Sequence, residues 1–172
     1  MSKTKVILVD DHEMVRLGLK SFLNLQDNVE VIGEASNGRQ GIDLALKLKP
    51  DVVVMDLVMP EMDGVEATLE LLKDWKEAKI LVLTSYLDNE KIYPVIEAGA
   101  KGYMLKTSSA AEILNAIQKV AKGDLAIETE VDKKIKDHHN NPDLHEDLTA
   151  RERDILALLA KGYDNQTIAD EL

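Results

Sequence analysis

Three short stretches of this chain contain only apolar residues, and they set the fold class. Their sequences are VILV at residues 6–9, VVVM at 52–55 and ILVL at 80–83. A strand with one face in water alternates apolar and polar residues, whereas a parallel strand covered on both faces is apolar throughout. The three stretches therefore predict buried strands of a parallel sheet.

Two further strands and a set of amphipathic segments complete this pattern. The additional strands are predicted at Val29–Ile32 and Tyr103–Leu105. Apolar residues recur at helical spacing in Met14–Leu25, Gly41–Leu48, Val65–Trp75 and Ala111–Val120. Strand and helix alternate five times along the chain, which predicts a doubly wound α/β fold with a five-stranded parallel sheet and right-handed crossovers.

The alternating pattern ends near Lys122, and the composition then changes. Residues 123–147 are polar and acidic and contain an Asn-Pro turn signal at 141–142, which predicts a linker. The next unit opens with a capping box formed by Thr149 and Glu152, and we predict two short helices there. We therefore expect a domain at 1–122, a linker at 123–147 and a partial all-α domain at 148–172.

Composition limits where such a chain works. It contains no cysteine, no apolar run long enough to span a bilayer and no signal-peptide profile at its N-terminus. We therefore expect a cytoplasmic protein with no membrane partner. The formal net charge of −11 argues against general nucleic-acid binding by these residues.

Polar side chains follow four of the predicted strands. Ligands of open parallel sheets bind beyond the carboxyl ends of the strands, so the residues at those ends outline a candidate site. They are Asp10 and Asp11 after the first strand, Asp56 after the third, Thr84 after the fourth and Lys106 after the fifth. The three carboxylates would repel one another there, and Mg²⁺, which prefers oxygen ligands, would relieve that repulsion.

These side chains are of the types that phosphoryl transfer to a protein carboxylate needs. Asp56 can act as a carboxylate nucleophile, while Mg²⁺ and Lys106 neutralise the phosphoryl oxygens. Thr84 can donate a hydrogen bond to the phosphoryl group after transfer. Each residue alone has an ordinary interpretation as a turn, cap or strand residue, and it is their joint placement that indicates chemistry.

Five segments of the chain carry a resemblance to a known family. They are VDDHEMVR, MDLVMPEMDG, LTS, GAKGYMLK and LTARERDILALLAKGYDNQTIADEL. In these segments the chain resembles two-component response regulators of the NarL/FixJ (LuxR-type) family, and within it the LiaR/VraR group of cell-envelope stress regulators. The resemblance covers a receiver domain from Lys5 to about Lys122 and a C-terminally truncated DNA-binding part. It implies the flavodoxin-like strand order 2-1-3-4-5.

The resemblance implies roles for individual residues. Asp56 is implied as the phosphoacceptor, Lys106 as the bridge to the phosphoryl group, and Thr84 with Tyr103 as the switch pair. The implied Mg²⁺ ligands are Asp11, Asp56, the backbone carbonyl of Val58 and, through water, Asp10.

Partners follow from the same resemblance. It implies that a sensor histidine kinase donates the phosphoryl group, that phosphorylation favours a homodimer, and that the full-length protein binds promoter DNA. Such a protein changes its own state rather than turning over a substrate, so we expect no turnover enzyme. Asn165–Leu172 matches only the scaffold helix of a helix-turn-helix, so we expect no specific promoter binding by these 172 residues alone.

Pro94 is a departure from a regular helical pattern. It lies in NEKIYPVIEAGA, where the fourth helix of the resembled family runs. A proline in mid-helix removes a hydrogen bond and clashes with the carbonyl four residues earlier. We therefore expect this helix to begin late or to be interrupted.

Three other functions compete with this interpretation. A haloacid-dehalogenase-type phosphatase needs a second acid two residues after its nucleophile, where this chain has Val58. A flavodoxin-like electron carrier needs a Ser/Thr/Gly-rich phosphate loop after the first strand, where this chain has DDHE. A stand-alone receiver acting through protein contacts is the remaining alternative, and the helical residues from Leu148 onward argue against it.

Overall fold

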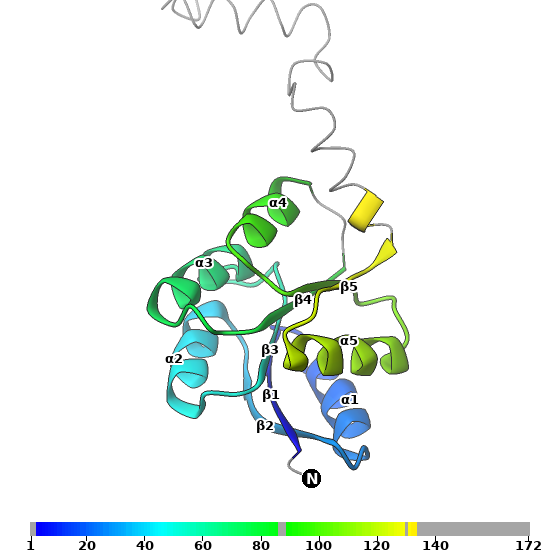
Figure 1. Ribbon diagram of the computed structural model, residues 1–172. Helices are drawn as coiled ribbons and strands as arrows, with labels where there is room; N and C mark the ends of the chain where they lie inside the picture. Colours follow the sequence, from blue (N-terminus) through cyan, green and yellow to red (C-terminus); the bar gives the residue numbers. More distant parts are fainter. Residues whose placement is uncertain (1–2, 86–88, 130, 134–172) are drawn as a thin grey trace, which may run out of the picture. The chain divides into compact units, whose positions relative to one another are not determined.

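The computed structural model describes residues 3–85, 89–129 and 131–133 (Figure 1). The predicted helical unit at 148–172 and most of the predicted linker at 123–147 lie outside these residues. In the described part of the chain, every helix is too short or too polar to traverse a lipid bilayer. The first of two compact units ends at Lys134 and contains the whole sheet.

The sheet is parallel and has the order β2-β1-β3-β4-β5-β6. Its strands are β1 Thr4–Val9, β2 Val29–Ala35, β3 Val52–Met55, β4 Ile80–Thr84, β5 Gly102–Leu105 and β6 Ala126–Ile127. All residues of β3 and β4 are buried, as the fully apolar runs predicted. The predicted α/β class and the order of the first five strands are confirmed.

Five helices connect and cover these strands. They are α1 Glu13–Asn24, α2 Gly38–Leu48, α3 Gly64–Asp74, α4 Asn89–Glu97 and α5 Ala110–Lys122. Figure 1 shows α1 and α5 on one face of the sheet, with α2 and α3 on the other. Alternate residues of β1, β3 and β4 pack with Leu23 of α1 and Ile117 of α5 into a buried cluster. Because the strands are parallel, their carboxyl ends lie at one edge of the sheet.

The sheet has one strand more than the sequence predicted. Helix α5 ends at Lys122 and is capped by Gly123, whose φ of 94° lies in the left-handed region that glycine adopts readily. The chain then adds β6 beside β5, with Gly102 opposite Ala126 and Tyr103 opposite Ile127. A two-residue strand within a polar segment has too few residues to show periodicity, which is why the sequence did not indicate it.

Helix α4 is continuous through Pro94. It runs from residue 89 to residue 97 with Pro94 inside it, so the expected late start or break is not observed. The helix is short, and Ile92 and Val95 are buried. Burial of this apolar face offsets the hydrogen bond that proline cannot donate.

Candidate functional site

Asp56 occupies the position directly after β3 and is 3% exposed. Its backbone N–H donates to the Val9 carbonyl at 2.8 Å, so its position is fixed by the neighbouring strand β1. Gly64, the first residue of α3, comes so close that a Cβ atom there would lie 1.9 Å from the Asp56 carbonyl oxygen. Only glycine fits this approach, and the chain after Asp56 is therefore held tightly against its own strand end.

Asp10 and Asp11 follow β1, as predicted, but their surroundings differ. The Asp10 side chain is 7% exposed, whereas that of Asp11 is 31% exposed. The backbone N–H of Asp10 donates to the Ala35 carbonyl at 3.1 Å, and Arg16 of α1 donates through Nη1 to the Asp10 carbonyl at 2.6 Å. Asp10 is thus anchored between β2 and α1, while Asp11 extends toward solvent.

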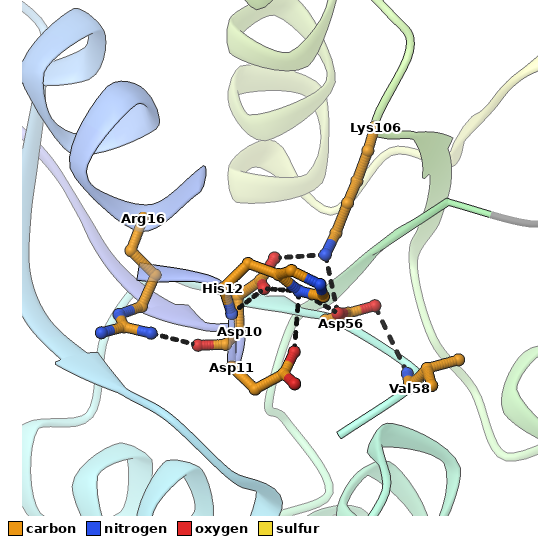
Figure 2. Close-up of polar contacts among 7 residues, drawn as sticks. All are labelled: Asp10, Asp11, His12, Arg16, Asp56, Val58 and Lys106. Atoms are coloured by element: carbon orange, nitrogen blue, oxygen red, sulfur yellow. Dashed lines mark hydrogen bonds and ion pairs between the residues drawn. The ribbon is translucent and has the colours of Figure 1, made fainter. Parts of the chain in front are cut away.

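Lys106, directly after β5, brings its ammonium group to the two buried carboxylates (Figure 2). Its Nζ atom lies 2.6 Å from Asp10 Oδ2 and 2.7 Å from Asp56 Oδ2. Its backbone N–H donates to the Thr84 carbonyl at 2.7 Å, so β4 supports the residue that carries the charge. The predicted convergence of the strand ends is therefore present for Asp10, Asp56 and Lys106.

The charges in this site are unbalanced, and the pKa values reflect it. Burial raises the pKa of the Asp56 carboxyl above its usual value, although the hydrogen bond from Lys106 acts in the opposite direction. Burial acts to lower the pKa of Lys106, yet hydrogen bonds to Asp10 and Asp56 raise it overall. The Lys106 ammonium thus stays charged while it hydrogen-bonds to two buried carboxylates. Even so, the loss of water around Asp56 disfavours its ionised form.

His12 also contacts this cluster, and the sequence interpretation did not include it. Its Nδ1 atom lies 2.8 Å from Asp11 Oδ1, 3.1 Å from Asp10 Oδ1 and 4.0 Å from Asp56 Oδ2. Its backbone N–H donates to Asp10 Oδ1 at 2.8 Å. The available signal was its position immediately after two candidate aspartates, because the turn into α1 brings that side chain back over them.

The donor atoms of this cluster fit a hard divalent cation. One ligand atom each from Asp10, Asp11, His12 and Asp56 lies within 4.8 Å of the others. Three of the four are carboxylate oxygens, the ligand type that Mg²⁺ prefers. The carboxylates carry more negative charge than Lys106 neutralises, so a divalent cation would complete the electrostatic balance.

Of the other predicted residues, Val58 and Thr84 lie at the same edge, whereas Tyr103 lies within the sheet. Val58 is 47% exposed, and its backbone N–H donates to Asp56 Oδ1 at 3.4 Å. Thr84 ends β4 and is 1% exposed, while Tyr103 in β5 is fully buried. The structure thus places Val58 beside Asp56, Thr84 beside Lys106 through its carbonyl, and Tyr103 in the sheet opposite Val82.

Two family models match this chain. "Response regulator receiver domain" matches residues 6–118, and "Bacterial regulatory proteins, luxR family" matches residues 146–172. The first therefore covers the part of the chain that forms the site.

Curated relatives and solved structures are similar along most of the chain. It is 51% identical to "Transcriptional regulatory protein LiaR" of Bacillus subtilis (strain 168), over 98% of this chain and 82% of that protein. It is 46% identical to "Response regulator protein VraR" of Staphylococcus aureus (strain Mu3), over 96% of this chain and 79% of that protein. A LuxR-family two-component response regulator from Aurantimonas sp. SI85-9A1 superposes with a TM-score of 0.75 at 32% identity, covering 80% of this chain and 99% of that structure.

Proposed function

The chain belongs to the response regulator family, with a receiver domain and a LuxR-type DNA-binding domain, and we propose that it works by accepting a phosphoryl group on Asp56. The observation that carries the proposal is the buried Asp56 carboxylate held 2.7 Å from the Lys106 ammonium, beside two further aspartates. Because Asp56 shares the Lys106 ammonium with Asp10, its negative charge is only partly neutralised. Such a carboxylate favours binding of a metal ion and of an electrophile.

In the proposed reaction a carboxylate oxygen of Asp56 attacks phosphorus. An oxygen–phosphorus bond forms, and the bond from phosphorus to the donor breaks, with the electron pair leaving on the donor atom. Lys106 neutralises developing charge on the phosphoryl oxygens from its place between Asp10 and Asp56. Asp11, Asp56, the Val58 carbonyl and, through water, Asp10 would hold Mg²⁺, which would supply Lewis-acid stabilisation.

The same site supports a switching role for Thr84 and Tyr103. The Thr84 carbonyl accepts the Lys106 N–H, so movement at the phosphoryl group is transmitted to β4. Tyr103 lies in β5, three residues before Lys106, with its ring fully buried. We infer that the Thr84 hydroxyl turns toward the phosphoryl group, and that the Tyr103 side chain changes position because the hydroxyl has left space behind it.

Partners and setting follow from family membership. We propose a sensor histidine kinase as phosphodonor, homodimer formation on phosphorylation, and promoter recognition by the LuxR-type domain, in a protein of the cytoplasm. The similarity to LiaR and VraR supports a role in the cell-envelope stress response. In this proposal the protein is a transcription factor that modifies itself and is no turnover enzyme.

Labelling by a small phosphodonor tests the phosphoacceptor. Acetyl phosphate with Mg²⁺ should modify the wild-type chain once, as seen by intact-protein mass spectrometry, and EDTA should prevent it. Asp56→Ala should not be modified, whereas Asp43→Ala, which removes an exposed aspartate of α2, should be modified like the wild type. Equal modification of Asp56→Ala, or undiminished modification in EDTA, would contradict the proposal.

A further inference from the structure

The segment after α5 (yellow in Figure 1) is bound to β5 by the pairing of its two-residue strand and by further hydrogen bonds. Strand β6 pairs through Ala126 and Ile127, and the Glu128 N–H then donates to the Tyr103 carbonyl at 3.0 Å. The Glu128 carbonyl in turn accepts the Asp132 N–H at 2.9 Å. Backbone bonds thus carry the segment along β5 as far as Tyr103.

The side chain of Glu128 continues the ladder where the backbone of β6 ends. Leu105, two residues beyond Tyr103, donates its N–H to Glu128 Oε2 at 2.9 Å. The Ser108 hydroxyl donates to the same oxygen at 3.0 Å. Glu128 is partly buried, and hydrogen bonds to an ionised acceptor are stronger than those between neutral groups.

These two bonds hold both ends of the turn that carries Lys106. The turn runs from Leu105 to Ser108 and is closed by the Ser108 N–H, which donates to the Leu105 carbonyl at 3.0 Å. Its other support is the Thr84 carbonyl, which accepts the Lys106 N–H. The backbone of Lys106 is thus fixed from β4 on one side and from Glu128 on the other.

The place of the Lys106 ammonium depends on this backbone. The lysine side chain is long and has many rotamers, so a shift at its Cα changes how often Nζ reaches Asp56. Transition-state stabilisation is sensitive to displacements of this size, since a misplacement of about 1 Å can lower a rate by about 10²-fold.

We propose that Glu128 is a positioning residue for Lys106, and that docking of residues 126–129 and 131–133 and phosphoryl binding at Asp56 strengthen each other. The proposal rests on Asp56 being the phosphoacceptor. Coupling between two sites is reciprocal: if the docked segment favours phosphoryl binding, phosphoryl binding must favour the docked segment by the same factor. Since residues 146–172 match the luxR family, the segment lies in sequence between the phosphorylation site and the output.

The first test measures how fast the full chain is labelled by acetyl phosphate at saturating Mg²⁺. Glu128→Ala should lower the maximal rate about tenfold, which corresponds to about 1.4 kcal/mol in the barrier. Glu128→Gln should recover part of the rate, because its amide oxygen still accepts hydrogen bonds but carries no charge. Asp124→Asn, which changes an exposed carboxylate just before this segment, should label like the wild type.

The second test measures the reciprocal effect by hydrogen exchange, with beryllofluoride and Mg²⁺ as the phosphoryl mimic. Binding should slow amide exchange at Leu105 and across residues 126–129 and 131–133 in the wild type and in Asp124→Asn. This response should be lost in Glu128→Ala and reduced in Glu128→Gln. Ser108→Ala, which removes one of the two bonds, should give an intermediate response. A purely structural role would change the exchange in the free protein and leave the response to beryllofluoride intact.

The outcomes separate this proposal from the one on which it rests. A wild-type chain that is not labelled at all contradicts the assignment of Asp56. Two results would overturn the role of Glu128. In the first, the wild type is labelled but amide exchange at 126–129 and 131–133 does not change on beryllofluoride binding. In the second, folded Glu128→Gln keeps both the full labelling rate and the full exchange response.

Discussion

Two groups of carboxylates lie at the same edge of the sheet and are satisfied in different ways. In the first group, Asp10 and Asp56 share the ammonium of Lys106, and the ring of His12 lies near Asp10, Asp11 and Asp56. Glu128 instead accepts neutral donors, the Leu105 N–H and the Ser108 hydroxyl. The first group has more negative charge than its neighbours neutralise, whereas the second has one carboxylate matched by fixed donors.

This difference distinguishes a binding site from an anchor. Buried charge without full compensation costs stability, and it persists where a ligand completes it. A carboxylate matched by backbone and hydroxyl donors needs no ligand and holds local structure instead. Removing a carboxylate charge should therefore stabilise the first cluster and destabilise the second, and the following variants test how the two clusters differ.

The largest effect is expected for Lys106→Met, measured without metal. Among the described residues, Lys106 supplies the only ammonium that contacts both buried carboxylates. Its loss should lower the free energy of unfolding by about 3 kcal/mol, since breaking a buried ion pair leaves a charge uncompensated. Urea denaturation of both proteins in EDTA measures the difference. Glu128→Gln, as the counterpart in the anchor, should lose clearly less; an equal loss would erase the contrast between the clusters.

Adding Mg²⁺ should have an effect of intermediate size, and only through the first cluster. At a concentration ten times the dissociation constant, bound Mg²⁺ should stabilise the folded protein by about 1.4 kcal/mol. Thermal denaturation with increasing Mg²⁺ should show this for the wild type and for Glu128→Gln. Asp11→Asn, which removes a carboxylate from the site, should respond much less, and an undiminished response there would place the metal elsewhere.

The smallest effect should have the opposite sign. Asp56→Asn should raise the free energy of unfolding by about 1 kcal/mol at neutral pH, because it removes a buried charge while Asp10 keeps Lys106. The folded pKa of Asp56 is raised above its usual 3.8, so the folded state binds a proton more readily than the unfolded chain. The wild type therefore loses stability as pH rises from 3.8 through the folded pKa.

That sign gives a specific pH dependence. In metal-free buffer the advantage of Asp56→Asn should be absent below the unfolded pKa, grow across this window and then stay constant. Urea titrations of both proteins from acidic to neutral pH measure it. An advantage that shrinks with rising pH would mean that Lys106 outweighs burial at Asp56.

The sequence was sufficient for the parts that depend on strand ends. Fully apolar runs identified β1, β3 and β4, and parallel strands necessarily bring their carboxyl ends to one edge. That geometry predicts that Asp10, Asp56 and Lys106 lie at one edge, and the family resemblance supplied the strand order that makes β1 and β3 neighbours. Asp56 and Lys106, which are 50 positions apart in the sequence, could therefore be assigned to one site from the sequence.

Only the tertiary structure decided how those groups share their contacts. It places Lys106 on Asp10 and Asp56, turns His12 back over Asp11, and brings Glu128 to the turn at Leu105. These contacts depend on side-chain rotamers, on a turn and on a two-residue strand, none of which produces a periodic pattern. Periodicity indicates which face of an element is buried. A single polar contact instead depends on shifts in atomic position of about an ångström or less, and those positions are set by packing.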